Sequence, residues 1–229
     1  ELNYLAGVAY DGMKKVPLAL DHFAKVTYPS RFYENAVANR AILLRDMGKL
    51  DQSIAVVRQA LVNDPHNVNY FLYLGSFYEE LERYDEALEV LVQGLSVDAK
   101  NARIHFRIGV IQDKAGRRNE AIEAMQQVLR IQPDDADALN YLGYTYADMG
   151  IHLNEAQSLV QRALTLKPDD GYITDSLAWV FYKQGRYEEA LKWLLKAVQI
   201  VPDDAVILEH LGDVYLKLGN KDKALKYYR

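Results

Sequence analysis

Leu142-Gly143-Tyr144-Thr145-Tyr146 carries a Leu-Gly-x-x-Tyr pattern that recurs as Leu74-Gly75-x-x-Tyr78 and as Leu211-Gly212-x-x-Tyr215. The glycine position holds a small residue along the whole chain: Gly7, Ala41, Gly75, Gly109, Gly143, Ala178 and Gly212. The intervals between these residues are 34, 34, 34, 34, 35 and 34. A fixed period of this length indicates a chain built from repeated supersecondary units.

A second series of small residues has the same period and comprises Ala19, Ser53, Ala87, Ala121, Ala156, Ala190 and Ala224. Small residues at regular positions mark places where two backbones approach closely. Both series contain one interval of 35, and the two long intervals overlap between Gly143 and Ala156. The sequence therefore predicts one inserted residue in the turn from Gly150 to Glu155.

Each repeat reads as a pair of helices joined by a turn. Glycine accepts the left-handed backbone at a helix C-terminus, so the first helices are predicted to end at Gly48, Gly116, Gly150, Gly185 and Gly219. Proline cannot continue a helix, so the second helices are predicted to stop before Pro65, Pro133, Pro168 and Pro202. The Asp pairs 134–135, 169–170 and 203–204 then stand where the next helix needs an N-cap, and we interpret them as caps and not as metal ligands.

This pattern resembles the tetratricopeptide repeat (TPR) family over essentially the whole chain. The resemblance implies an all-α fold, a right-handed superhelical solenoid of helix-turn-helix repeats. It divides residues 1–229 into a single array of about seven repeats: 1–33, 34–67, 68–101, 102–135, 136–170, 171–204 and a truncated 205–229. The first two repeats depart most from the pattern, since Arg40 and Ala41 replace the usual Leu-Gly.

Composition excludes several classes of protein. Half of the 229 residues are hydrophobic and 26% are charged, which is typical of folded domains. A net charge of −5 argues against a nucleic-acid partner, because phosphate binding needs an excess of cations. The absence of cysteine excludes disulfides, zinc–thiolate sites and a catalytic thiol. The longest stretch without Asp, Glu, Lys or Arg, Pro65 to Tyr78, is too short to cross a bilayer, so we expect no membrane insertion.

No catalytic or nucleotide-binding motif occurs in the sequence, and no two histidines stand four residues apart on one helix. We therefore expect no enzymatic activity, no cofactor and no metal site. His105 falls in a packing position of a first helix, while His66 and His152 fall in turns.

The TPR resemblance also implies where a partner binds. In that family, positions 2, 5, 6, 9 and 12 of each first helix line a concave groove. Carried over to this chain, these positions include six aromatic residues: Phe106, Tyr141, Tyr144, Tyr172, Trp179 and Tyr182. Their rings either bind a partner or pack between neighbouring first helices. The predicted partner-binding residues are Arg103, Phe106, Arg107, Asn140, Tyr141, Tyr144, Tyr172, Asp175, Trp179 and Tyr182.

Arg103 and Arg107 match the basic positions with which some chaperone-binding TPR proteins clamp a peptide carboxylate. The remaining clamp positions hold Ala38, Ile42 and Tyr73 in place of Lys and Asn, so the full clamp is not expected. Two interpretations stay open for the arginines. One is a local contact with an anion or acidic peptide. The other is an internal ion pair with Glu79, Asp113 or Asp137.

The leading hypothesis is a non-catalytic protein–protein interaction scaffold that binds a peptide segment or helix of a partner protein in the groove. One alternative is a targeting or regulatory arm of a larger enzyme. Another is a self-associating array, since the truncated last repeat leaves an apolar edge at Leu218, Leu225 and Tyr228.

The run from Asn140 to Leu195 resembles TPR proteins of the Gram-negative bacterial cell envelope. The shared marks are the longer turn and the stretch Asp175-Ser176-Leu177-Ala178-Trp179. This resemblance implies an envelope scaffold on the periplasmic side in preference to the cytoplasm. The chain opens without Met or a signal peptide, so we expect it to be a piece of a longer protein.

Overall fold

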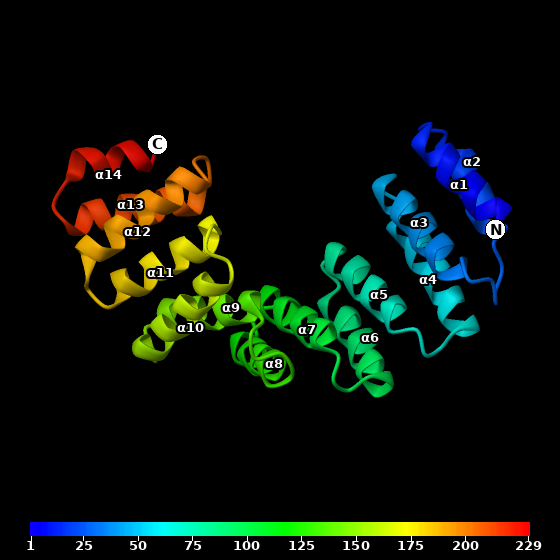
Figure 1. Cartoon of the computed structure of the whole chain (residues 1–229), viewed down its shortest axis with the longest axis horizontal. Coiled ribbons are helices and arrows are strands. Elements are labelled where there is room, and N and C mark those ends of the chain that lie inside the picture. Colours follow the sequence, from blue (N-terminus) through cyan, green and yellow to red (C-terminus); the bar gives the residue numbers. More distant parts are fainter. The chain divides into compact units, whose positions relative to one another are not determined.

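A computed structural model describes all 229 residues and contains fourteen α-helices and no strand (Figure 1). The helices form two compact units, Glu1–Arg118 and Asn119–Arg229, and each is described by itself. The all-α repeat fold predicted from the sequence is confirmed. None of the helices combines the length and the apolar composition that crossing a membrane requires.

The first unit contains three helix hairpins, α1/α2, α3/α4 and α5/α6, followed by α7. Its helices are α1 (Leu2–Gly12), α2 (Val16–Ala24), α3 (Tyr33–Asp46), α4 (Leu50–Asn63), α5 (Val68–Glu80), α6 (Tyr84–Val97) and α7 (Ala102–Lys114).

The second unit contains α8 followed by the hairpins α9/α10, α11/α12 and α13/α14. Its helices are α8 (Arg118–Ile131), α9 (Ala136–Asp148), α10 (Leu153–Leu166), α11 (Gly171–Lys183), α12 (Tyr187–Ile200), α13 (Ala205–Lys217) and α14 (Lys221–Tyr227). The predicted fourth repeat, 102–135, places α7 in one unit and α8 in the other. The division into a single seven-repeat array therefore stays a prediction.

The predicted N-caps are confirmed for the second residue of each Asp pair. Asp135, Asp170 and Asp204 each accept backbone N–H groups from the first turn of the helix that follows. Asn67 and Asn101 do the same for α5 and α7. Each cap satisfies backbone donors that have no partner within the helix, so all five helices begin at a defined residue.

The turns after the first helices share one left-handed residue. The five predicted glycines have φ between 69° and 80°, and Lys14 and Glu82 adopt the same conformation at 59° and 57°. The backbone geometry thus repeats even where glycine does not. In the longer turn, His152 adds a second left-handed residue, with φ 49°, directly before α10. The predicted insertion therefore lies between Gly150 and Leu153.

In the α3/α4 and α9/α10 hairpins, members of the two small-residue series contact each other. Every member of the second series is at most 2% exposed. In the α3/α4 hairpin, Ser53 Oγ donates a hydrogen bond of 2.8 Å to the carbonyl oxygen of Ala41, which belongs to the first series. In the α9/α10 hairpin, a Cβ on Gly143 would lie 2.9 Å from the carbonyl oxygen of Ala156 and 2.4 Å from Val160 Cγ2. In α9/α10 the first helix therefore contacts the backbone of the second with no room for a methyl group, whereas in α5/α6 a Cβ on Gly75 would meet the side chain of Leu91.

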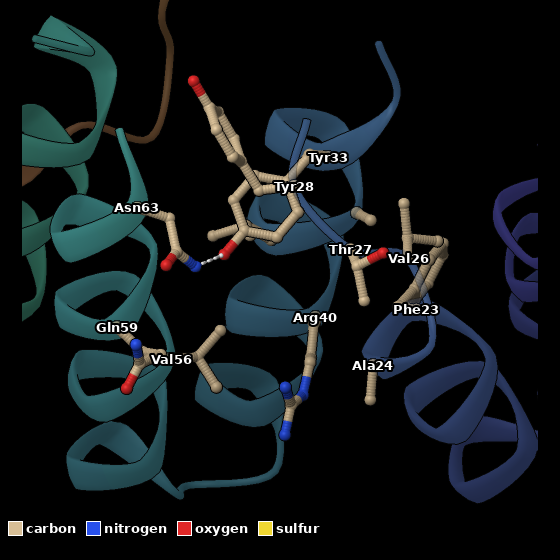
Figure 2. A pocket seen from close by; sticks show the side chains of 12 residues that line it. Phe23, Ala24, Val26, Thr27, Tyr28, Tyr33, Arg40, Val56, Gln59 and Asn63 are labelled. Atoms are coloured by element: carbon tan, nitrogen blue, oxygen red, sulfur yellow. Dashed lines mark hydrogen bonds between the residues drawn. The ribbon is translucent and has the colours of Figure 1, made fainter. Parts of the chain in front are cut away.

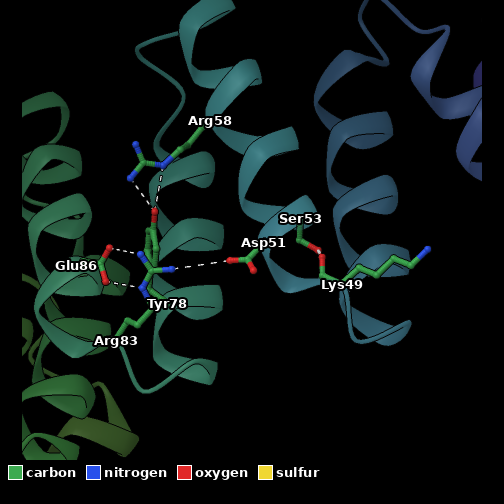
Figure 3. Close-up of polar contacts among 7 residues, drawn as sticks. All are labelled: Lys49, Asp51, Ser53, Arg58, Tyr78, Arg83 and Glu86. Atoms are coloured by element: carbon green, nitrogen blue, oxygen red, sulfur yellow. Dashed lines mark hydrogen bonds and ion pairs between the residues drawn. The ribbon is translucent and has the colours of Figure 1, made fainter.

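The tyrosine of the repeated pattern links one hairpin to the next. Tyr78 on α5 is 2% exposed, and its hydroxyl accepts hydrogen bonds from Nε and an Nη of Arg58 on α4, at 3.1 and 2.7 Å. Figure 3 shows this contact together with Arg83, which lies over the Tyr78 ring and pairs with Glu86. In the second unit, Gln126 Nε2 on α8 donates to the hydroxyl of Tyr146 on α9 at 3.1 Å, across the same sequence separation.

The substitution Gly143→Ala tests the close contact between α9 and α10. The added Cβ meets backbone, and overpacking of this kind costs about 1–3 kcal/mol, against about 1 kcal/mol gained from the helix propensity of alanine. We expect a net loss of about 1 kcal/mol in the free energy of unfolding, measured by urea denaturation with far-UV circular dichroism. Gly12→Ala is the control, because a Cβ there meets nothing within 4 Å. Equal stability of both variants would contradict the contact.

Tyr78→Phe tests the link between hairpins. It removes the acceptor of a charged donor while leaving the ring in place, so we expect the free energy of unfolding to fall by about 1 kcal/mol. Tyr84→Phe is the matched control in the same unit, since the partly buried Tyr84 has no hydrogen bond through its hydroxyl. A loss of the same size in both variants would show that the Arg58 contact contributes nothing.

Candidate functional site

The first helices of the second unit form a three-helix face. Since α11 packs against both α9 and α13, the three helices lie side by side. Each is 13 residues long and starts directly after its aspartate cap. Residues at equal distances from the caps therefore form rows across the face, and seven of the ten predicted partner-binding residues belong to it.

A stack of three rings forms the floor of this face. Trp179 lies between Tyr182 and His210, with ring centroids 4.7 Å and 4.0 Å away and interplanar angles of 7° and 14°. Tyr144 on α9 approaches the same histidine, with a centroid distance of 6.4 Å. Only 9% of Trp179 is exposed, so this tryptophan packs between first helices and is not an open anchor for a partner.

A buried pair joins α11 to α13 beside the ring stack. His210 Nδ1 lies 3.0 Å from both carboxylate oxygens of Asp175, and both side chains are 8% exposed. A buried carboxylate needs such a partner, because isolation of its charge from water is costly. Asp175, one of the predicted partner-binding residues, pairs with the histidine on which Trp179 stacks. Trp179 Nε1 and Asn140 Oδ1 are also buried, without a hydrogen-bond partner in the chain.

The surface of the face carries exposed apolar side chains. Tyr172 and Val206 are the second residues of α11 and α13, and they are 56% and 50% exposed. Leu216, near the other end of α13, is 49% exposed. A row of apolar groups beside a packed aromatic floor is a surface that gains free energy when a partner covers it.

An acidic group borders this surface on α13. Glu209 is exposed and has no hydrogen bond or ion pair, while Asp213, one turn further, accepts a 2.6 Å hydrogen bond from the Tyr228 hydroxyl. Two causes raise the pKa of Tyr228 to about 12: partial burial, which is the larger, and this hydrogen bond. The pKa of Tyr182 is also raised, mainly by burial and to a smaller extent by the nearby Asp213 carboxylate. The two carboxylates give this corner a negative potential that favours a cationic side chain.

The other three predicted residues lie on α7 in the first unit and are not part of this face. Arg107 Nη1 pairs with Glu79 at 3.0 Å, one of the internal partners that the sequence allowed, and Lys114 binds the same carboxylate at 2.8 Å. Arg103 is exposed and lies 3.5 Å from Asn69 Oδ1, and Phe106 is partly buried.

Sequence reasoning did not single out Val206, Glu209, Asp213 or Leu216, although they occupy the same helix positions as the predicted residues. Aromatic residues received the weight, whereas the structure exposes Val206, Glu209 and Leu216 and, among the aromatic members on this face, exposes Tyr172 alone. The signal that could have found the acidic pair is its spacing, Glu209 and Asp213 being neighbours on one helix face. No group of three or more His, Asp or Glu side chains is arranged to hold a metal ion.

Comparisons with known proteins agree with this architecture. A family model described as TPR repeat matches residues 114–150 and 179–219, and one described as tetratricopeptide repeat matches residues 39–93. A comparison with curated proteins gives no match.

Among solved structures, PilW, a widely conserved type IV pilus biogenesis factor, is similar with a TM-score of 0.74 and 23% identity, over 86% of this chain and 91% of that one. A tetratricopeptide repeat protein from Parabacteroides merdae has a TM-score of 0.73 and 19% identity, over 86% and 78%. YrrB, described as a TPR protein with an unusual peptide-binding site, has a TM-score of 0.60 and 24% identity, over 77% and 93%. Together, the two family models match more than half of the residues, and the chain belongs to the tetratricopeptide repeat family.

Proposed function

We propose that this chain is a non-catalytic scaffold that binds a segment of a partner protein on the α9–α11–α13 face. The observation that carries the proposal is the exposure of Tyr172 and Val206, which are in register on neighbouring first helices. Exposed aromatic and aliphatic groups on a rigid base are typical of the residues that dominate binding energy at protein interfaces.

The charges of the face specify the partner further. No cation pairs with Glu209, and Asp213 only accepts a hydrogen bond from the neutral hydroxyl of Tyr228. The corner of the face near Tyr182 is therefore acidic. Asp137, on the far side of the face, is already paired with Lys167 at 2.7 Å. A partner segment that places an apolar side chain on Tyr172 and Val206 and a Lys or Arg side chain near Glu209 satisfies both features.

The family and the solved structures support an interaction role for the fold, and the peptide-binding site named for YrrB supports a peptide as the partner. Self-association is a second candidate, because a second copy can present an apolar side chain to the exposed Tyr172 and Val206. In that case a second copy, and not a peptide, would cover the apolar surface. Light scattering over a range of concentrations separates the two candidates.

Peptides selected from a phage-displayed random library test the proposal on the full chain. In a Trp193→Phe background, fluorescence reports only on Trp179, which lies in the floor of the face. We expect selected peptides rich in aliphatic and basic residues, and a tenfold or greater loss of affinity in Tyr172→Ala and in Glu209→Lys, about 1.4 kcal/mol or more each.

Leu195→Ala is the matched control, since Leu195 is also exposed in this unit but lies on the second helix α12. Its affinity is expected to equal that of the parent. Peptides that lose affinity in Leu195→Ala and keep it in Tyr172→Ala would move the site away from the first helices. A selection that yields no binder at all would refute the peptide-binding function.

A further inference from the structure

A cleft on the first unit lies between α2 and α4, with α3 as its floor (Figure 2). It consists of two hollows of about 210 Å³ and 440 Å³. Ala24, Arg40 and Val56 line both hollows, so the hollows meet at these residues. Figure 2 shows the Arg40 side chain extending from α3 between Val56 and Ala24. We call this surface the Arg40 cleft.

Arg40 stands where other repeats bury leucine. Leu74, Leu142 and Leu211 occupy the equivalent position and are at most 2% exposed. The apolar surroundings are still present around the arginine, because Val37 and Leu44 on the same helix are buried and line the cleft. The result is a guanidinium group among groups that elsewhere pack an aliphatic side chain.

This guanidinium has no partner in the chain. Arg40 is partly buried and makes no hydrogen bond, ion pair or cation–π contact. The only other charged residue that lines either hollow is Asp21, and Lys25 Nζ already binds its carboxylate at 2.6 Å. Transfer of a cation from water into apolar surroundings is unfavourable unless an anion accompanies it. The charge and the shape of the cleft are therefore complementary to a carboxylate.

We propose that the Arg40 cleft binds an acidic segment of a partner protein, in which a Glu or Asp side chain pairs with Arg40 and an apolar residue on each side enters a hollow. Guanidinium can grip a carboxylate with two parallel hydrogen bonds. The hollows extend in both directions along α3 from Arg40, one toward Tyr33 and the other toward Leu44. A chain that continues past the arginine fills both, whereas a terminal carboxylate fills one.

This site is independent of the face described above. It is formed by α2, α3 and α4 of the other unit, and it selects an acidic segment where the α9–α11–α13 face selects a basic one. Failure of either proposal leaves the other unaffected, because the two tests use different variants and peptides of opposite charge.

The test uses the full chain and a fluorescein-labelled, C-terminally amidated peptide with the core Val-Glu-Val, with Val-Gln-Val as its neutral counterpart. Fluorescence polarisation should show at least tenfold weaker binding of the Gln peptide to the parent protein. Arg40→Gln should bind the Glu peptide more weakly than the parent protein does, by the same factor. It should bind the Glu and Gln peptides with equal affinity. Arg45→Gln is the control, since Arg45 lies on the same helix but is paired with Asp46.

Arg40→Leu adds a readout that does not depend on binding. It restores the leucine of the other repeats and removes an unpaired cation, so its melting temperature should rise while binding of the Glu peptide is lost. A fall in melting temperature would show that Arg40 supports the fold, and would overturn the proposal. Equal affinity for the two peptides, no binding to the parent protein, or stronger binding of a Val-Gln-Val peptide with a free terminal carboxylate would overturn it as well.

Discussion

The close contact between the two helices of each hairpin is the constraint on which the rest of the structure depends. Gly143 lies so near the backbone of α10 that a single methyl group would collide with the carbonyl oxygen of Ala156. In α3/α4, Ser53 Oγ donates a hydrogen bond to the carbonyl oxygen of Ala41 at the equivalent position. Because the helices of these two pairs meet at a fixed point, the rotation of each helix about its axis is fixed too. The small residues at these contacts recur in the sequence with the 34-residue period.

Links between neighbouring hairpins then determine which side chains reach solvent. Tyr78 and Tyr146 each bind the second helix that precedes them, through Arg58 and Gln126. Aspartate caps start α9, α11 and α13 at equivalent positions, which aligns their exposed residues in rows. On this face Tyr182, Trp179 and His210 form the ring stack, and the buried Asp175 contacts His210 beside it. Packed aromatic groups on the same face as the exposed apolar ones give it a preformed shape, which lowers the entropic cost of binding.

The two candidate binding surfaces arise in opposite ways. The α9–α11–α13 face follows the repeat pattern and gains its character from the residues that the pattern leaves variable. The Arg40 cleft arises where the pattern is broken, since the position that anchors a leucine in three other repeats holds a cation. The guanidinium cannot pack among these apolar groups as a leucine does, and open hollows lie on both sides of it. A departure from the repeat is therefore as informative about binding as the repeat itself.

The sequence alone determined the helix-pair repeat, the caps and the turns, because these depend on residues close to one another in the chain. The periods of the two small-residue series located the hairpins, and the 35-residue interval located the insertion that the structure places before Leu153. The sequence also supplied the helix positions that form the face and named Glu79 among the partners of Arg107. Only the tertiary structure decided that Trp179 is covered while Tyr172 is open, and that Asp175 pairs with His210. Exposure depends on which helix lies alongside, and that neighbour is another repeat, 34 or 35 residues away in the chain. For the same reason, the sequence marked Arg40 as unusual, but only the packing of α2 and α4 around it produced a cleft.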